Sequence, residues 1–154
     1  MATQNNSGMS TLNDLETTLE TYFVDKAPFQ IPKDIKELIV KIAPILTIIF
    51  VILSIPAILA LFGLSAMLTP FMMGTTYAMG PLWWISTVLI TVAVVFEALA
   101  IPGLLNRTMQ GWKYIFYSQL ISLVATLIQG NIIGAIISGL IGLYILFQVK
   151  EMYK

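Results

Sequence analysis

Residues 42–96 read IAPILTIIFVILSIPAILALFGLSAMLTPFMMGTTYAMGPLWWISTVLITVAVVF and contain no Asp, Glu, Lys or Arg. A second charge-free segment covers residues 114–149. One membrane crossing takes roughly 17 to 25 apolar residues, so the first segment has room for two crossings and the second for two short ones. The sequence therefore predicts an all-α, polytopic membrane protein with four transmembrane helices in residues 44–154. We expect these helices at about residues 45–68, 82–105, 112–128 and 132–149.

The composition of the chain restricts the chemistry that it can perform. Of the 154 residues, 58% are hydrophobic and 10% are charged, whereas soluble domains carry about 25% charged residues. The chain has no Cys and no His, which excludes thiol nucleophiles, Ser-His triads, His-ligated haem and the usual zinc sites. Asp25, Asp34 and Glu37 lie near the predicted membrane interface, but we interpret them as solvated charges rather than as a catalytic pair. We predict a non-enzymatic protein with no cofactor, no metal site and no nucleic-acid partner.

The basic residues predict the orientation of the helices. In a four-crossing arrangement all of them fall on the side of the membrane that holds the two termini. They are Lys26, Lys33, Lys36, Lys41, Arg107, Lys113, Lys150 and Lys154. The opposite connections, residues 69–81 and 129–131, contain no charge, so the positive-inside rule places both termini in the cytoplasm. A re-entrant hairpin formed by the last two helices would also leave the C-terminus inside and is the structural alternative.

The residues before the first crossing are expected to form a disordered start, residues 1–10, and an amphipathic arm, residues 11–43. The first helix of the arm carries an apolar stripe at helical spacing. The stripe consists of Leu12, Leu15, Leu19, Tyr22 and Phe23. Acidic side chains occupy the other face of this helix, and an anionic leaflet repels them. We therefore predict that the stripe packs on protein, either on the second half of the arm or on a partner.

The second half of the arm, residues 32–42, is predicted to be a short amphipathic helix in the cytoplasmic interface. Three lysines give it a net positive charge, which suits a position beside anionic headgroups. These lysines, Lys33, Lys36 and Lys41, form the predicted interfacial anchor. The chain is then expected to turn into the membrane at Pro44.

Glu97 is the single ionisable residue in the predicted membrane interior. An ionised carboxylate is costly in hydrocarbon, so such a residue must be protonated, paired or hydrated, and it is a functional-site candidate. Counting to the same depth along the neighbouring helices identifies Gln119 as the expected hydrogen-bond partner. A protonated Glu97 that donates to Gln119 would hold two helices together. Alternatively, the Glu97 carboxyl and the Ala98 carbonyl, to which Pro102 cannot donate, would together hold a proton or a small cation.

Small residues recur at four-residue spacing along the last predicted helix. They are Gly130, Gly134, Ser138 and Gly142. This pattern lets another helix approach closely, and it predicts a helix-packing face. The partner of this face is open between the first or second transmembrane helix, a second copy of the chain and a foreign subunit.

Three segments resemble small uncharacterised four-helix bacterial inner-membrane proteins of the same layout. They are KELIVKIAP at residues 36–44, IPAILALFGL at residues 55–64 and EALAIPGLL at residues 97–105. The resemblance implies a bacterial source and the inner membrane, and it implies no activity.

These features lead to two functional hypotheses. The first is an accessory or structural subunit of a membrane assembly, or a small homo-oligomer, whose partners are the lipid bilayer and either other membrane subunits or further copies of itself. The second is a proton- or cation-coupled transporter of small solutes, centred on Glu97.

Overall fold

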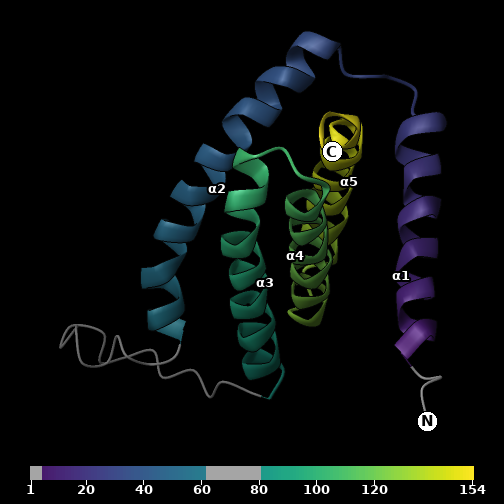
Figure 1. Cartoon of the computed structure of the whole chain (residues 1–154). Helices are drawn as coiled ribbons and strands as arrows, with labels where there is room; N and C mark the ends of the chain where they lie inside the picture. The colour runs from purple at the N-terminus through teal and green to yellow at the C-terminus, as the bar shows by residue number, and fades with distance from the viewer. Residues whose placement is uncertain (1–4, 62–80) are drawn as a thin grey trace.

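The computed structural model describes residues 5–61 and 81–154, and within them it contains helices and no strand. The elements follow one another as α1 (Asn5–Glu20), the π-helical η1 (Thr21–Asp25), α2 (Lys33–Leu61), α3 (Pro81–Leu105), α4 (Met109–Ile128), α5 (Ile132–Gln148) and the 3₁₀-helix η3 (Lys150–Met152). The predicted all-α class is confirmed over this part of the chain. Figure 1 shows α3, α4 and α5 running antiparallel in turn, with α2 beside α3.

Three of the helices are long and apolar enough to cross a membrane. The spans lie at Lys33–Ala60 in α2, Trp84–Leu105 in α3 and Ile132–Met152 at α5. The described residues therefore have the features of a membrane protein with three candidate spans. α4 is not one of these spans, and its 20 residues include Lys113 and Gln119.

The ends of α3, α4 and α5 agree with the predicted boundaries to within three residues. Capping side chains fix two of the starts, because Thr108 accepts a hydrogen bond from the Gly111 N–H, and Asn131 accepts one from the Gly134 N–H. The turn between α4 and α5 contains Gly130 at a φ of +78°. Glycine adopts this left-handed conformation without steric cost, which ends α4 and reverses the chain.

The predicted interfacial helix is not separate from the first crossing, because α2 is one helix from Lys33 to Leu61 with both Pro44 and Pro56 inside it. Figure 1 shows α2 bent rather than interrupted. A proline removes one backbone hydrogen bond and kinks a helix, but the helix continues when the flanking residues favour it. The separate interfacial helix at residues 32–42 is thus the first part of α2. The end of the predicted first crossing, residues 62–68, lies outside the described residues.

The predicted disordered start is also shorter than expected, because α1 begins at Asn5. Adding residues to an existing helix avoids the cost of nucleation, so α1 extends beyond its apolar stripe toward the N-terminus. Residues 1–4 lie outside the described residues. The main contact of the α1–η1 segment with the rest of the chain is between η1 and α5, so this segment packs on α5 rather than on the second half of the arm.

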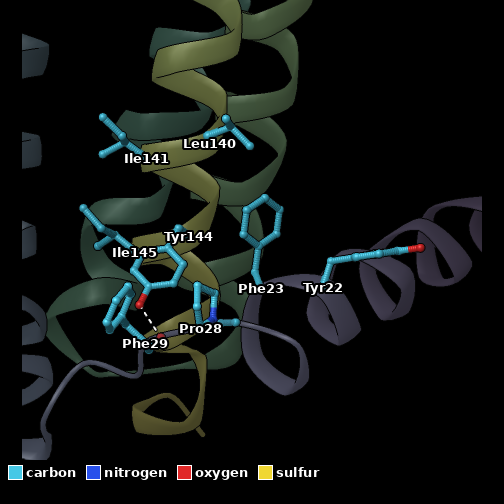
Figure 2. A pocket seen from close by; sticks show the side chains of 9 residues that line it. Tyr22, Phe23, Pro28, Phe29, Leu140, Ile141, Tyr144 and Ile145 are labelled. Atoms are coloured by element: carbon cyan, nitrogen blue, oxygen red, sulfur yellow. Dashed lines mark hydrogen bonds between the residues drawn. The ribbon is translucent and has the colours of Figure 1, made fainter.

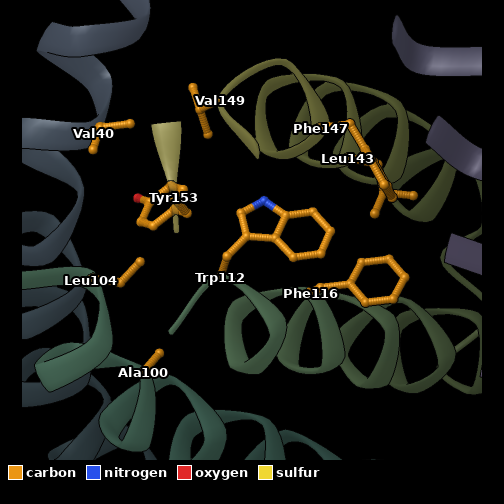
Figure 3. Close-up of a cluster of buried hydrophobic side chains, with 9 residues drawn as sticks. All are labelled: Val40, Ala100, Leu104, Trp112, Phe116, Leu143, Phe147, Val149 and Tyr153. Atoms are coloured by element: carbon orange, nitrogen blue, oxygen red, sulfur yellow. The ribbon is translucent and has the colours of Figure 1, made fainter. Parts of the chain in front are cut away.

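The hydrophobic core lies at the end of the bundle that carries the C-terminus, around Trp112 (Figure 3). The Trp112 side chain is fully buried, and its indole N–H donates a 2.8 Å hydrogen bond to the Leu146 carbonyl of α5. Its ring stacks on Phe116 at 5.5 Å and meets the edge of Phe147 at 5.3 Å. The complete core cluster is Val40, Ala100, Leu104, Trp112, Phe116, Leu143, Phe147, Val149 and Tyr153. This cluster fixes α2, α3, α4 and α5 to one another at one end.

The closest helix contact is between α3 and α4, at Gly103 and Gly111. A Cβ atom built on Gly103 would lie 2.5 Å from the Gly111 Cα, and one on Gly111 would lie 2.6 Å from the Leu104 backbone nitrogen. Backbone therefore meets backbone at this crossing, which only two glycines permit. The sequence analysis did not identify this pair.

Of the predicted glycine face of α5, Gly142 packs on a side chain of α4, a helix that was not among the expected partners. A Cβ on Gly142 would lie 2.8 Å from the Gln119 amide nitrogen of α4, whereas a Cβ on Gly130 would meet nothing within 4 Å. Gly134 faces the Asn131 side chain of its own helix cap, and Ser138 is exposed. The turn at residues 129–131 is so short that α4 and α5 must lie side by side, and this decides the partner.

Candidate functional sites

Glu97 lies in the middle of the helical bundle with one carboxylate oxygen bound and the other free. Its Oε1 accepts a 3.0 Å hydrogen bond from the Ser118 hydroxyl, which joins α3 to α4. Its Oε2 is buried and has no hydrogen-bond partner among the described residues. A buried carboxylate oxygen without a partner is costly, so this atom marks a place where a ligand or water would be stabilising.

A cavity of about 410 Å³, lined by both polar and apolar side chains, opens next to this carboxylate, between α2, α3, α4 and α5. Six polar side chains gather on its wall. They are Ser54, Glu97, Gln119, Ser122, Thr126 and Ser138. The rest of the wall is apolar, and Phe50 and Ile58 of α2 belong to it. The cavity thus combines one carboxylate, one carboxamide and several hydroxyls with an apolar surface.

A second cavity, of about 440 Å³, touches Glu97 from the side of α2 and also includes Thr47. Phe50 and Glu97 line both cavities. No Lys or Arg belongs to the lining of either one. An ionised Glu97 therefore has no counter-charge from the residues that line these cavities.

The predicted partner Gln119 shares the cavity with Glu97, but it is the neighbouring residue Ser118 that donates a hydrogen bond to Glu97. The Gln119 amide donates to the Ser138 carbonyl of α5 at 3.4 Å. Counting residues along each helix to the same depth in the membrane identifies the turn of α4 that lies beside Glu97. It does not fix the direction of the side chain, because adjacent positions on a helix point about 100° apart. The pair thus forms one site around a cavity rather than a direct contact.

A second site lies at the C-terminal end of the bundle, where residues 21–32, here called the strap, cross α5. The buried Gln148 side chain holds the strap at two points. Its Oε1 accepts a 3.3 Å hydrogen bond from the Ile31 N–H, and its Nε2 donates a 2.9 Å bond to the Phe23 carbonyl. The Tyr144 hydroxyl donates to the Phe29 carbonyl, as the dashed line in Figure 2 shows. These bonds give the strap a fixed path.

The sequence analysis missed Gln148 and Tyr144. A buried carboxamide at the end of an apolar helix, only 1% exposed, needs partners for both its donor and its acceptor. Gln148 at the end of a charge-free run is therefore a signal that backbone from elsewhere in the chain lies against it. An apolar groove of about 560 Å³ lies between the strap and α5 (Figure 2), and Phe23 and Leu140 are on its wall.

Ion pairs join the arm to the C-terminal residues. Lys150 contacts Glu16 at 2.9 Å and Glu20 at 2.6 Å, so one lysine of the bundle pairs with two acidic side chains of α1. Lys36, predicted as part of an anchor in the lipid interface, is 7% exposed and pairs with Glu151 at 2.8 Å. The other two lysines of the predicted anchor, Lys33 and Lys41, are exposed.

The structure divides the apolar stripe of the arm into two parts. Leu19 and Phe23 pack against the core, where Phe23 stacks on Phe147 at 6.2 Å. Leu12 and Leu15 are each 41% exposed, and Tyr22 is 59% exposed and points away from α5 in Figure 2. The apolar side chains of Leu12 and Leu15 on α1 thus stay partly exposed in the part of the chain that the structure describes.

Comparison of the chain with protein-family models, with curated proteins and with solved structures finds no match. The resemblance to small bacterial inner-membrane proteins stays a prediction. The function must therefore be argued from the cavity, the strap and the exposed part of α1.

Proposed function

We propose that this chain is a non-enzymatic integral membrane protein that works by association, as an accessory or structural subunit of a membrane assembly or as a small homo-oligomer. The observation that carries the proposal is the geometry of α1. Its C-terminal end is fixed to the bundle by Lys150 and by the strap, while Leu12 and Leu15 remain exposed. A helix that is anchored at one end and apolar on its free part suits docking on another protein.

Four membrane crossings with both termini in the cytoplasm are part of this proposal. α3 and α5 run in the same direction, and α4 returns between them with short connections at residues 106–108 and 129–131. If both α3 and α5 cross the bilayer, α4 must cross it as well. Its 20 residues span roughly 30 Å as a helix, which matches the hydrocarbon core. The distribution of Lys and Arg and the resemblance noted above favour the inner membrane of a bacterium.

Cysteine labelling tests this topology cleanly because the natural chain has no Cys. Gln129→Cys places a thiol at the connection between α4 and α5, and Gln110→Cys places one at the start of α4. Both positions are exposed in the structure. In sealed right-side-out vesicles, a membrane-impermeant maleimide is expected to label Gln129→Cys at once and Gln110→Cys only after permeabilisation. Protection of both thiols would support the re-entrant hairpin and contradict four crossings.

Substitution of the exposed leucines tests the association directly. The double variant Leu12→Gln and Leu15→Gln removes the free part of the stripe, and its native particle is expected to shrink toward the 17.0 kDa of one chain. Asn13→Gln with Thr17→Gln is the matched control, because both residues are exposed on the polar part of the same helix. Particle mass is measured after extraction in mild detergent. A double leucine variant that keeps the particle size of the wild type would exclude α1 as the docking element.

A second candidate function is proton- or cation-coupled transport, which the free Oε2 of Glu97 beside a polar cavity favours. In proteoliposomes, Glu97→Gln is expected to abolish proton or cation flux while helical circular dichroism stays unchanged. Ser118→Ala removes the hydrogen bond but keeps the carboxyl, and it should retain flux. Equal flux in the wild type and in Glu97→Gln would exclude this function.

A further inference from the structure

We propose that the cavity beside Glu97 binds a lipophilic organic cation, with the positive group against the carboxylate and the apolar body against the helix surfaces. This inference rests on the second candidate function and specifies its ligand. The proposal requires binding, whether or not the bound cation is then carried across the membrane.

The charge of the ligand follows from the lining of the two cavities. Glu97 is the one acidic residue on either wall, and neither wall contains a Lys or Arg. An ionised carboxylate in a low-dielectric interior is strongly stabilised by a cation at contact distance. The free Oε2 is the atom that would receive it, since Oε1 already accepts from Ser118.

The chemical class of the cation follows from the remaining wall. Inorganic cations such as Mg²⁺ and Ca²⁺ need several oxygen ligands, often more than one of them a carboxylate. No group of three acidic or other metal-binding side chains exists among the described residues. Three hydroxyls of the first cavity donate to carbonyls of their own helices, Ser54 to Phe50, Thr126 to Ser122 and Ser138 to Ala135, and the larger part of both walls is apolar. A ligand with one positive group and a large apolar body suits these walls better than a hydrated ion.

The size and the aromatic lining support the same class. Volumes of about 410 and 440 Å³ lie in the range of sites for small organic molecules. Phe50 lines both cavities together with Glu97, and an aromatic face attracts an organic cation. Phe50 is also 58% exposed, and Leu53 on the second cavity is 68% exposed. The second cavity therefore reaches the outer face of α2, where a lipophilic cation dissolved in the bilayer would enter.

Two probes of the same shape and opposite charge test the proposal on the full chain in lipid nanodiscs. Tetraphenylphosphonium carries the positive charge, and tetraphenylborate is its anionic counterpart. Equilibrium binding is measured by dialysis against protein-free nanodiscs, which corrects for partition into lipid. The wild type is expected to bind the phosphonium at least tenfold more tightly than the borate. Equal binding of the two probes, or no binding of the phosphonium above the lipid background, would overturn the proposal without any variant.

Variants then assign the binding to the cavity. Glu97→Gln is expected to weaken phosphonium binding at least tenfold. Glu37→Gln removes the same charge from an exposed position outside both cavities and should leave binding unchanged. Unaltered binding in a folded Glu97→Gln variant would overturn the proposal. Phosphonium binding without any flux would exclude transport and support the cation site. Flux that depends on Glu97 without phosphonium binding would support transport and exclude the cation site.

Discussion

Replacement of Trp112 by alanine is expected to lower the free energy of unfolding by about 3–5 kcal/mol, the range for a fully buried large aromatic side chain. The Trp112 ring contacts Phe116 and Phe147, and its N–H bonds to the Leu146 carbonyl. Alanine would leave a cavity in the centre of the core cluster and remove one of the hydrogen bonds that link α4 to α5. Because this cluster joins four helices at one end of the bundle, its loss should also release the C-terminal residues that pack there.

The measurement is unfolding of the purified protein by added denaturing detergent, followed by helical circular dichroism. Trp84→Ala is the matched control, because Trp84 lies on α3 with 47% of its surface exposed. Trp84→Ala should lower the free energy of unfolding by well under half as much as Trp112→Ala. Equal destabilisation by the two substitutions would contradict the position of the core. Trp112→Phe should fall between the wild type and Trp112→Ala, since it keeps a ring but not the N–H donor.

Replacement of Gly111 by alanine is expected to be nearly as damaging, at or above about 3 kcal/mol, the upper end of the usual cost of overpacking. The added methyl group would lie 2.6 Å from the Leu104 backbone nitrogen, so neither a rotamer change nor a side-chain shift relieves the clash. α3 and α4 would have to separate along their closest contact. The connection at residues 106–108 is too short to absorb that movement.

Graded controls are available for this prediction on other helices. A methyl group at Gly139 would meet the flexible end of Leu123 at 2.9 Å, and one at Gly8 would meet nothing within 4 Å. The expected order of destabilisation is Gly111→Ala, then Gly139→Ala, with Gly8→Ala neutral or slightly stabilising because alanine favours helix. The same unfolding titration gives all three values. A Gly139 variant that is less stable than the Gly111 variant would contradict the backbone contact between α3 and α4.

Hydropathy predicted α3, α4 and α5 well because the causes of these helices are local. Each is an apolar run that ends at a turn, and Thr108 and Asn131 are ordinary capping residues. The continuous helix at Pro44 was not predicted, because a helix continues through a proline when the segments on both sides of it stabilise the helical conformation. In α2 the apolar run after Pro44 and the burial of Val40 and Lys36 before it stabilise one continuous helix.

The contacts between distant segments were not accessible from the sequence. Gln148 binds backbone groups more than a hundred residues away, and no local pattern contains the identity of that backbone. The Glu97 site could be predicted because an ionised group in the membrane interior is energetically costly, and this cost can be recognised from one residue alone. Its partner depends on which face of α4 points toward α3, and the close contact at Gly103 and Gly111 decides that face. The four-residue spacing of small residues predicted a packing face on α5 and gave no indication of the contact between Gly103 and Gly111.

Association of this protein with others through α1 is tested most directly by the native mass of the particle extracted from its own membrane. The protein is extracted in mild detergent, its mass is measured by light scattering, and the co-migrating chains are identified. The account predicts a particle that contains several chains and clearly exceeds the 17.0 kDa of one copy. A homogeneous particle with one copy of this chain and no other protein would contradict it.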